Sequence, residues 1–191
     1  MIQIIADTNI LINLYGAFLH KGQNVKPLKS FSQILKSIEN KKLEIFASQE
    51  ILKEFSFSQG KSDIAISNFK AFLTQYIHPL HFSDLQQNQI GKVVYSLGHD
   101  KITYTNEYNV VMKDQILFPE AQKAGDRNFI DLTILAQAVI AGFSVVTINK
   151  KDFEGYKYMK PLLEKQGIKF VPKVFSVQDF TRAQKTEEQI F

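Results

Sequence analysis

The chain has 191 residues, with 23 Lys and Arg against 19 Asp and Glu, a formal net charge of +4, and no Cys. The lack of Cys excludes disulfides, thiolate zinc sites, iron–sulfur clusters and a Cys nucleophile. The longest apolar stretch, residues 134–146, contains polar residues and is shorter than the ~20 residues of a membrane span. The N-terminus has no basic region typical of a signal peptide. We therefore expect a cytoplasmic protein without a membrane segment.

Hydrophobic periodicity predicts alternating strands and helices in the first third of the chain. Short apolar runs bounded by polar residues indicate buried strands, and apolar residues three and four apart indicate helices. The predicted elements are strands at 2–6 and 43–47 and helices at 9–18, at 31–39 and from Ser48, as N-cap, through Phe55.

The rest of the chain continues the pattern with one interruption. Residues 98–125 show no clean period, so we expect an irregular or partly helical segment there. The other predicted elements are helices at 64–77 and 85–97, separated by His78-Pro79, a helix at 128–141 ended by Gly142, a strand at 144–148 and a last short strand at 170–171.

This alternation predicts an α/β sandwich around a mostly parallel sheet. In sheets of this kind, functional sites lie at the carboxyl ends of the strands. That rule directs attention to Asp7, to residues 48–54 and to residues 147–152.

Acids and amides occupy several of these positions. Asp7 follows the first strand directly, and its simplest role is to cap the next helix. Asp131 stands in the first turn of an apolar helix, where a buried carboxylate needs a cation or the helix N-terminus to stabilise it. The other candidates are Glu50 and Glu54, which share one helix face, Asp126 in the loop before Asp131, and Asn149 and Asp152 after the last clear strand.

Carboxylates that converge from several strand ends are suited to hard divalent cations, which prefer oxygen ligands and waters. Such a cation can generate hydroxide and stabilise the in-line transition state of phosphodiester hydrolysis. Residues 150–173 also contain seven Lys against three acids, a basic stretch suited to phosphate-rich partners.

Four segments resemble the motifs of PIN-domain nucleases and occur in that family's order. Together they span residues 2 to about 175. The similar segments are residues 6–12, like the opening motif, residues 48–54, with the second acid at Glu54, residues 130–138, with the third acid at Asp131, and residues 143–153, like the closing strand with its Thr and its Asp-Phe pair.

The resemblance implies one three-layer α/β/α domain over residues 1–191, with a mostly parallel central sheet and a helical or irregular insertion at about 60–125. It also implies an endoribonuclease that uses Mg²⁺ or Mn²⁺ to hydrolyse RNA without a covalent enzyme intermediate. The family includes many VapC-type toxins, which pair with a protein antitoxin and often form homodimers. The chain is therefore a candidate toxin of such a pair.

Roles for individual residues follow from the resemblance. The metal ligands would be Asp7, Glu54 and Asp131, and the fourth position is open between Asp126, Asn149 and Asp152. Asn9 and Thr147 would orient water or a carboxylate, although turn and strand-end roles explain them equally well. In the basic stretch, the residues expected to hold the RNA backbone are Lys150, Lys151 and Lys157.

Two other interpretations stay open. A phosphatase of the haloacid dehalogenase type also has an Asp after an apolar strand, but its second Asp would fall on Asn9, and Thr147 follows Asp126 where the order should be reversed. A non-catalytic RNA-binding PIN-like domain would need degraded acids, whereas all three are present. Indifference to Mn²⁺ would identify such a binder.

Overall fold

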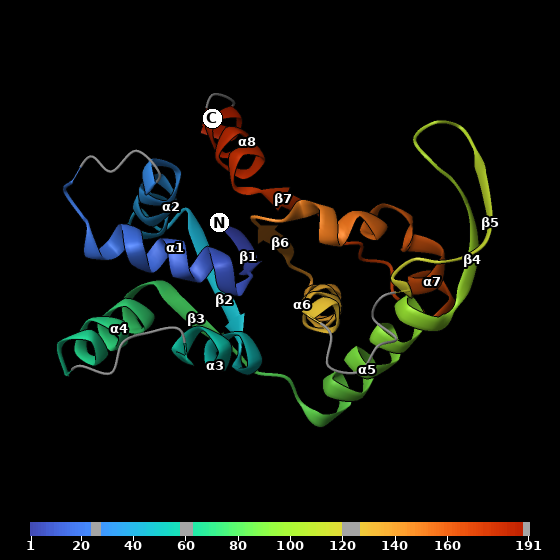
Figure 1. Ribbon diagram of the computed structural model, residues 1–191, viewed down its shortest axis with the longest axis horizontal. Coiled ribbons are helices and arrows are strands. Elements are labelled where there is room, and N and C mark those ends of the chain that lie inside the picture. The colour runs from blue at the N-terminus through green and yellow to red at the C-terminus, as the bar shows by residue number, and fades with distance from the viewer. Residues whose placement is uncertain (24–27, 58–62, 120–126, 189–191) are drawn as a thin grey trace. The chain divides into compact units, whose positions relative to one another are not determined.

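The computed structural model describes residues 1–23, 28–57, 63–119 and 127–188 (Figure 1). The chain divides into two compact units. The first comprises Met1–His81, Ser144–Ile148 and Phe175–Phe191, and the second comprises Phe82–Phe143 and Asn149–Val174. No helix in the described part is long and apolar enough to cross a membrane.

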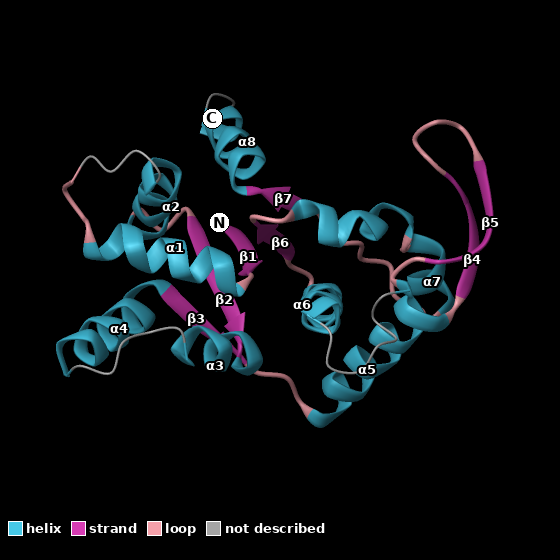
Figure 2. Cartoon of the chain, in the orientation of Figure 1, coloured by secondary structure: helices cyan, strands magenta, loops and turns pink. Residues whose placement is uncertain are grey.

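A five-stranded sheet with the strand order β3-β2-β1-β6-β7 forms the centre of the first unit (Figure 2). Strand β1 is parallel to both of its neighbours, and β2 is parallel to β3. This mostly parallel sheet confirms the predicted α/β class. The strands are β1 Ile2–Ala6, β2 Leu43–Ser48, β3 Ile77–Leu80, β6 Ser144–Thr147 and β7 Val174–Ser176.

The sheet forms because its central strands are almost continuously apolar. Ile4, Ile45 and Val145 have no exposed surface, as expected for parallel strands covered on both faces. The chain runs from β1 to β2 and β3 on one side, and β6 then pairs with the other side of β1. The strand order therefore reverses between β1 and β6, and a crevice opens at the carboxyl ends of strands at such a point.

Helices of the first unit share an aromatic core beside the sheet. Tyr15 on α1 lies with its ring centroid 6.0 Å from that of Phe55 on α3 and 5.4 Å from that of Phe72 on α4. These buried rings fix the three helices relative to one another. The helices of this unit are α1 Thr8–Leu19, α2 Lys29–Glu39, α3 Gln49–Phe57, α4 Asp63–Tyr76 and α8 Val177–Glu188.

The second unit combines helices with a two-stranded antiparallel hairpin. Helix α5 begins at a capping box in which Ser83 and Gln86 bond reciprocally, and it packs against α6. The rings of Tyr104 in the hairpin and Tyr158 in η3 stack with centroids 4.1 Å apart. The elements are α5 Asp84–His99, β4 Lys101–Thr105, β5 Val111–Ile116, α6 Arg127–Ala141, η3 Lys150–Tyr158 and α7 Lys160–Lys165.

Three elements differ from the sequence prediction. The hairpin of β4 and β5 replaces the irregular or partly helical chain expected there, because most of its side chains are exposed and leave no apolar period. His78-Pro79 does separate two helices, α4 and α5, but it lies in a strand that was not predicted, β3, where Pro79 is tolerated because β3 is an edge strand. The last strand is β7, four residues later than the expected strand at 170–171.

Candidate functional site

Asp7 lies directly after β1 and is 6% exposed. Its Oδ1 accepts a hydrogen bond of 2.8 Å from the backbone N–H of Ile10, so Asp7 does cap α1. Its Oδ2 accepts a hydrogen bond of 2.5 Å from Oγ1 of Thr147, a fully buried residue at the end of β6. Asp7 therefore joins the carboxyl ends of β1 and β6, where the strand order reverses.

Glu54 is connected to the same strand end through Thr8. The Thr8 Oγ1 donates a hydrogen bond of 2.5 Å to Oε2 of Glu54 on α3. Thr8 is buried, and the Glu54 side chain is exposed. Within the described residues, Glu54 has no other hydrogen bond or ion pair. Because Thr8 follows Asp7 in the chain, Glu54 is hydrogen-bonded to the residue next to the other predicted ligand.

Local structure explains why Glu54 reaches this position. Strand β2 is the parallel neighbour of β1, so both strands end at the same edge of the sheet. Helix α3 begins directly after β2, where Oγ of Ser48 accepts a hydrogen bond of 3.5 Å from the backbone N–H of Ile51. This is the capping role predicted for Ser48. The first turns of α3 therefore bring Glu54 to the end of β1.

Burial raises the pKa of Asp7 above its usual value of 3.8. The hydrogen bonds from Thr147 and from backbone N–H groups, Ile10 foremost, oppose this effect by stabilising the carboxylate. All of these donors are neutral. A cation near Asp7 would stabilise the negative carboxylate, which burial alone disfavours.

The remaining predicted ligands belong to the second unit or lie outside the described residues. Asp131 is partly exposed in the first turns of α6. Asn149 Nδ2 donates a hydrogen bond of 2.5 Å to Oδ2 of Asp152, and both residues are exposed. Two of the three candidates for the fourth position are thus bonded to each other. The third, Asp126, lies outside the described residues.

The first unit offers two carboxylates to a possible cation, those of Asp7 and Glu54. Among the residues that the structure describes, no three His, Asp or Glu side chains form a group that could hold a metal ion. Mg²⁺, however, is commonly held by one or two carboxylates, with waters and substrate phosphates completing its octahedral shell. The hard oxygens of Asp7 and Glu54 are of the type that such a cation prefers, and Oε1 of Glu54 carries no described hydrogen bond.

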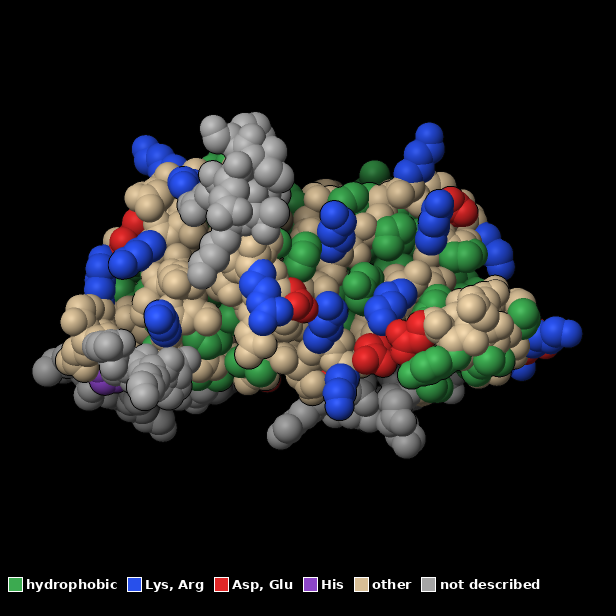
Figure 3. Space-filling model, turned by 90° about the horizontal axis from the view of Figure 1, so that it is seen from above, with side chains coloured by type: hydrophobic (Ala, Val, Ile, Leu, Met, Phe, Trp, Pro, Cys, Tyr) green, Lys and Arg blue, Asp and Glu red, His purple; other side chains and the backbone are tan. Residues whose placement is uncertain are grey.

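The other predicted side chains have simpler surroundings. Asn9 is exposed, and its backbone carbonyl accepts a hydrogen bond of 2.8 Å from Nδ2 of Asn13. Lys151 and Lys157 are exposed, and Nζ of Lys157 lies 3.6 Å from an oxygen of Glu107. Lys and Arg side chains are more frequent than Asp and Glu on the face shown in Figure 3. Lys150, the third predicted RNA-binding residue, is half-buried.

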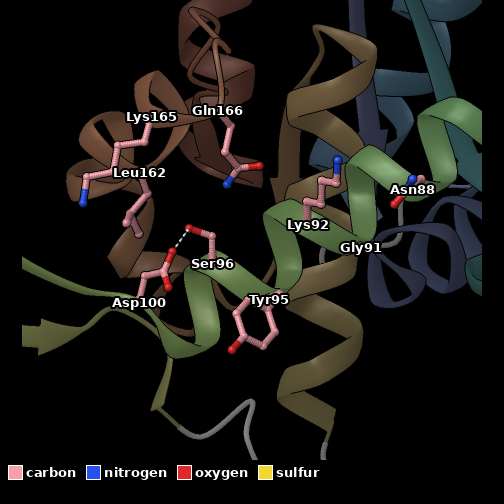
Figure 4. A pocket seen from close by; sticks show the side chains of 9 residues that line it. All are labelled: Asn88, Gly91, Lys92, Tyr95, Ser96, Asp100, Leu162, Lys165 and Gln166. Carbon is pink, nitrogen blue, oxygen red and sulfur yellow. Dashed lines mark hydrogen bonds between the residues drawn. The ribbon is translucent and has the colours of Figure 1, made fainter.

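A pocket of about 450 Å³ lies elsewhere in the second unit, between α5 and α7 (Figure 4). Gln166 points into the gap between the two helices, and Ser96 Oγ donates a hydrogen bond of 2.6 Å to Oδ2 of Asp100 beside it. None of the described residues predicted for the site lines this pocket. The pocket is therefore separate from the candidate site.

Comparison with known proteins identifies the fold. No family model matches the chain. No curated protein sequence matches it either. A chain in the crystal structure of VapBC2 from Rickettsia felis, bound to a DNA fragment from their promoter, aligns with 92% of this chain and 98% of its own length, with 17% identity and a TM-score of 0.52. The DNA-bound VapBC structure from Salmonella typhimurium aligns with 93% and 99%, with 16% identity and a TM-score of 0.52.

The chain has a PIN-like fold. The alignment covers nearly the whole chain, so the likeness includes both compact units. This confirms the resemblance drawn from the four sequence segments.

One polar residue of the candidate site, Thr8, was not predicted from the sequence. Its position directly after Asp7, at the start of a helix, was the only available signal. That signal is weak because Thr is common in first turns for local reasons. The partner of Thr8 lies 46 residues away, so the hydrogen bond depends on how α3 packs.

Proposed function

We propose that the protein is an endoribonuclease that hydrolyses RNA phosphodiester bonds with Mg²⁺ or Mn²⁺. The observation that carries the proposal is the pairing of two carboxylates with two buried Thr hydroxyls at the end of β1. This pairing lies where the strand order of a PIN-like fold reverses. Burial makes the ionised form of Asp7 costly, and buried ionisable groups with perturbed pKa values are concentrated at functional sites.

Asp7 and Glu54 would hold the cation through carboxylate oxygens, with Asp131 as the proposed third ligand and the fourth position open between Asp126, Asn149 and Asp152. A bound Mg²⁺ or Mn²⁺ would activate water and stabilise charge that develops on the phosphate oxygens. Thr147 orients Asp7 by donating to Oδ2, and we assign Asn9 to the outer part of the site.

The exposed Lys side chains of the second unit would hold the RNA backbone. The ion pair between Lys157 and Glu107 is exposed, and such pairs contribute only ~0–1 kcal/mol, so a phosphate can replace Glu107. Lys150 and Lys151 precede Lys157 on η3. We also propose that the protein acts in the cytoplasm as the toxin of a pair, with a protein antitoxin and as a homodimer, because the similar solved structures are VapBC complexes.

The test is cleavage of a labelled single-stranded RNA by the purified protein. We expect cleavage with Mn²⁺ and none with EDTA, and we expect Asp7→Asn to lose at least about 100-fold in rate. Asp84→Asn is the matched control, since Asp84 is an exposed acid in the first turn of α5, and it should cleave like the wild type.

Other outcomes separate the alternatives. Full cleavage by Asp7→Asn would overturn the assignment of the site. RNA binding without cleavage, unaffected by Mn²⁺, would identify a non-catalytic RNA-binding domain. Release of phosphate from small phosphomonoesters, with RNA left intact, would favour the phosphatase alternative.

A further inference from the structure

The Thr8 hydroxyl donates a hydrogen bond to one of the two oxygens of the Glu54 carboxylate. Thr8 is 8% exposed and begins α1, so its backbone is fixed by the helix and its side chain by burial. It donates to Oε2, and within the described part of the chain the structure assigns Oε1 no partner. The carboxylate is therefore held at one oxygen and available at the other.

This one-sided attachment has a consequence for cation choice. Mg²⁺ and Mn²⁺ accept one oxygen from each carboxylate in an octahedral shell. Ca²⁺ is larger, takes six to eight oxygens and often binds both oxygens of one carboxylate. For Glu54 to bind a cation with both oxygens, Oε2 would have to turn away from Thr8 and lose its hydrogen bond.

We propose that Thr8 is a positioning residue that makes the site selective for Mg²⁺ and Mn²⁺ over Ca²⁺. This inference rests on the proposed function, because it concerns the same cation site. Thr suits the role better than Ser, since its β-branch restricts the χ1 angle and leaves the hydroxyl fewer directions. Without the hydroxyl, the long Glu54 side chain is free to present both oxygens.

The test measures the affinity of the full-length protein for Mn²⁺ and for Ca²⁺ separately by titration calorimetry. Thr8→Val keeps the shape and removes the donor. We expect its Kd for Mn²⁺ to rise about tenfold, as is usual when a ligand loses its supporting hydrogen bond. Its Kd for Ca²⁺ should change little, so the ratio of the Kd for Ca²⁺ to the Kd for Mn²⁺ should fall about tenfold. Thr8→Ser should restore at least part of the Mn²⁺ affinity.

Thr181→Val is the matched control. Thr181 is 9% exposed on α8, and its hydroxyl donates to the backbone carbonyl of Gln178 at 3.1 Å. The substitution has the same chemistry and similar burial, and it should leave both Kd values unchanged. Thermal unfolding of each variant checks that the fold is retained.

The results distinguish this inference from the proposed function. If the wild type binds Mn²⁺ and cleaves RNA but Thr8→Val keeps the same ratio of Kd values, only the role of Thr8 is overturned. An equal loss of affinity for both cations would also overturn it, because a purely structural role predicts that result. A wild type that binds neither cation would overturn both proposals.

Discussion

The hydrogen bonds of the predicted site residues differ between the two compact units. In the first unit, Asp7 is buried and held by Thr147, and Glu54 is held by buried Thr8. In the second, Asn149 and Asp152 bond to each other on the surface, three residues apart. The long-range bond between buried Thr147 and Asp7 is expensive to leave unmade, whereas a local exposed bond competes with water. The first unit therefore contains the more strongly constrained part of the candidate site.

Thr147→Val should have the largest effect on stability. It removes the donor to Oδ2 of a buried carboxylate, so we expect a loss of about 3 kcal/mol in the free energy of unfolding. Thr133→Val is the control, because Thr133 bonds to the Phe129 carbonyl of its own helix. Urea unfolding at pH 7 measures both variants. Equal stability of the two would contradict the contrast between buried and local hydrogen bonds.

Gly155→Ala tests whether packing is equally strict in the second unit. A Cβ at Gly155 would lie 2.8 Å from the Phe118 ring, so we expect a loss of about 2 kcal/mol from overpacking. Gly91→Ala is the matched control on α5, where the Cβ would meet nothing within 4 Å and should add helix propensity. Thermal unfolding should show the two substitutions shifting Tm in opposite directions. A shift in the same direction would exclude the packing argument.

Asp7→Asn should raise stability at neutral pH when no divalent cation is present. Burial raises the pKa of Asp7, so the stabilising contribution of its protonated form is complete below 3.8 and is lost as the pH rises through the folded-state pKa. At pH 7 the ionised group is therefore unfavourable, and its removal should add about 1 kcal/mol, a rise in Tm of roughly 2–4 °C. The gain should shrink toward pH 4. A less stable variant in EDTA at pH 7 would contradict this.

Asp152→Asn should have the smallest effect. The side chain is exposed and its partner Asn149 is local, so the free energy of unfolding should change by less than about 0.5 kcal/mol. Urea unfolding in EDTA measures it. A loss above about 1 kcal/mol would show that this pair is structural, and the two units would then not differ as described.

Much of the first unit could be predicted from sequence because its signals are local. The apolar runs of β1 and β2 and the cap at Ser48 identify the strand ends where Asp7 and Glu54 lie. The bond between Thr8 and Glu54 was not predictable, because it depends on the packing of α3 against α1.

In the second unit, the hairpin was not predicted, for a different reason. Of β4, only Ile102 is buried, so the alternation that identifies a strand is almost absent. The hairpin is held instead by contacts distant in sequence, such as the stack of Tyr104 on Tyr158. Isolated hairpins are marginally stable, so these contacts determine whether it forms.

We propose that Asp7 and Glu54 hold a divalent cation at the end of β1. Calorimetric titration with Mn²⁺ of the wild type, Asp7→Asn and Glu54→Gln measures this binding, with Asp84→Asn as the control. We predict binding by the wild type and the control, and at least about a tenfold weaker Kd for each of the two site variants. Binding of Mn²⁺ by Asp7→Asn and Glu54→Gln with the wild-type Kd would show that these two carboxylates do not hold the cation.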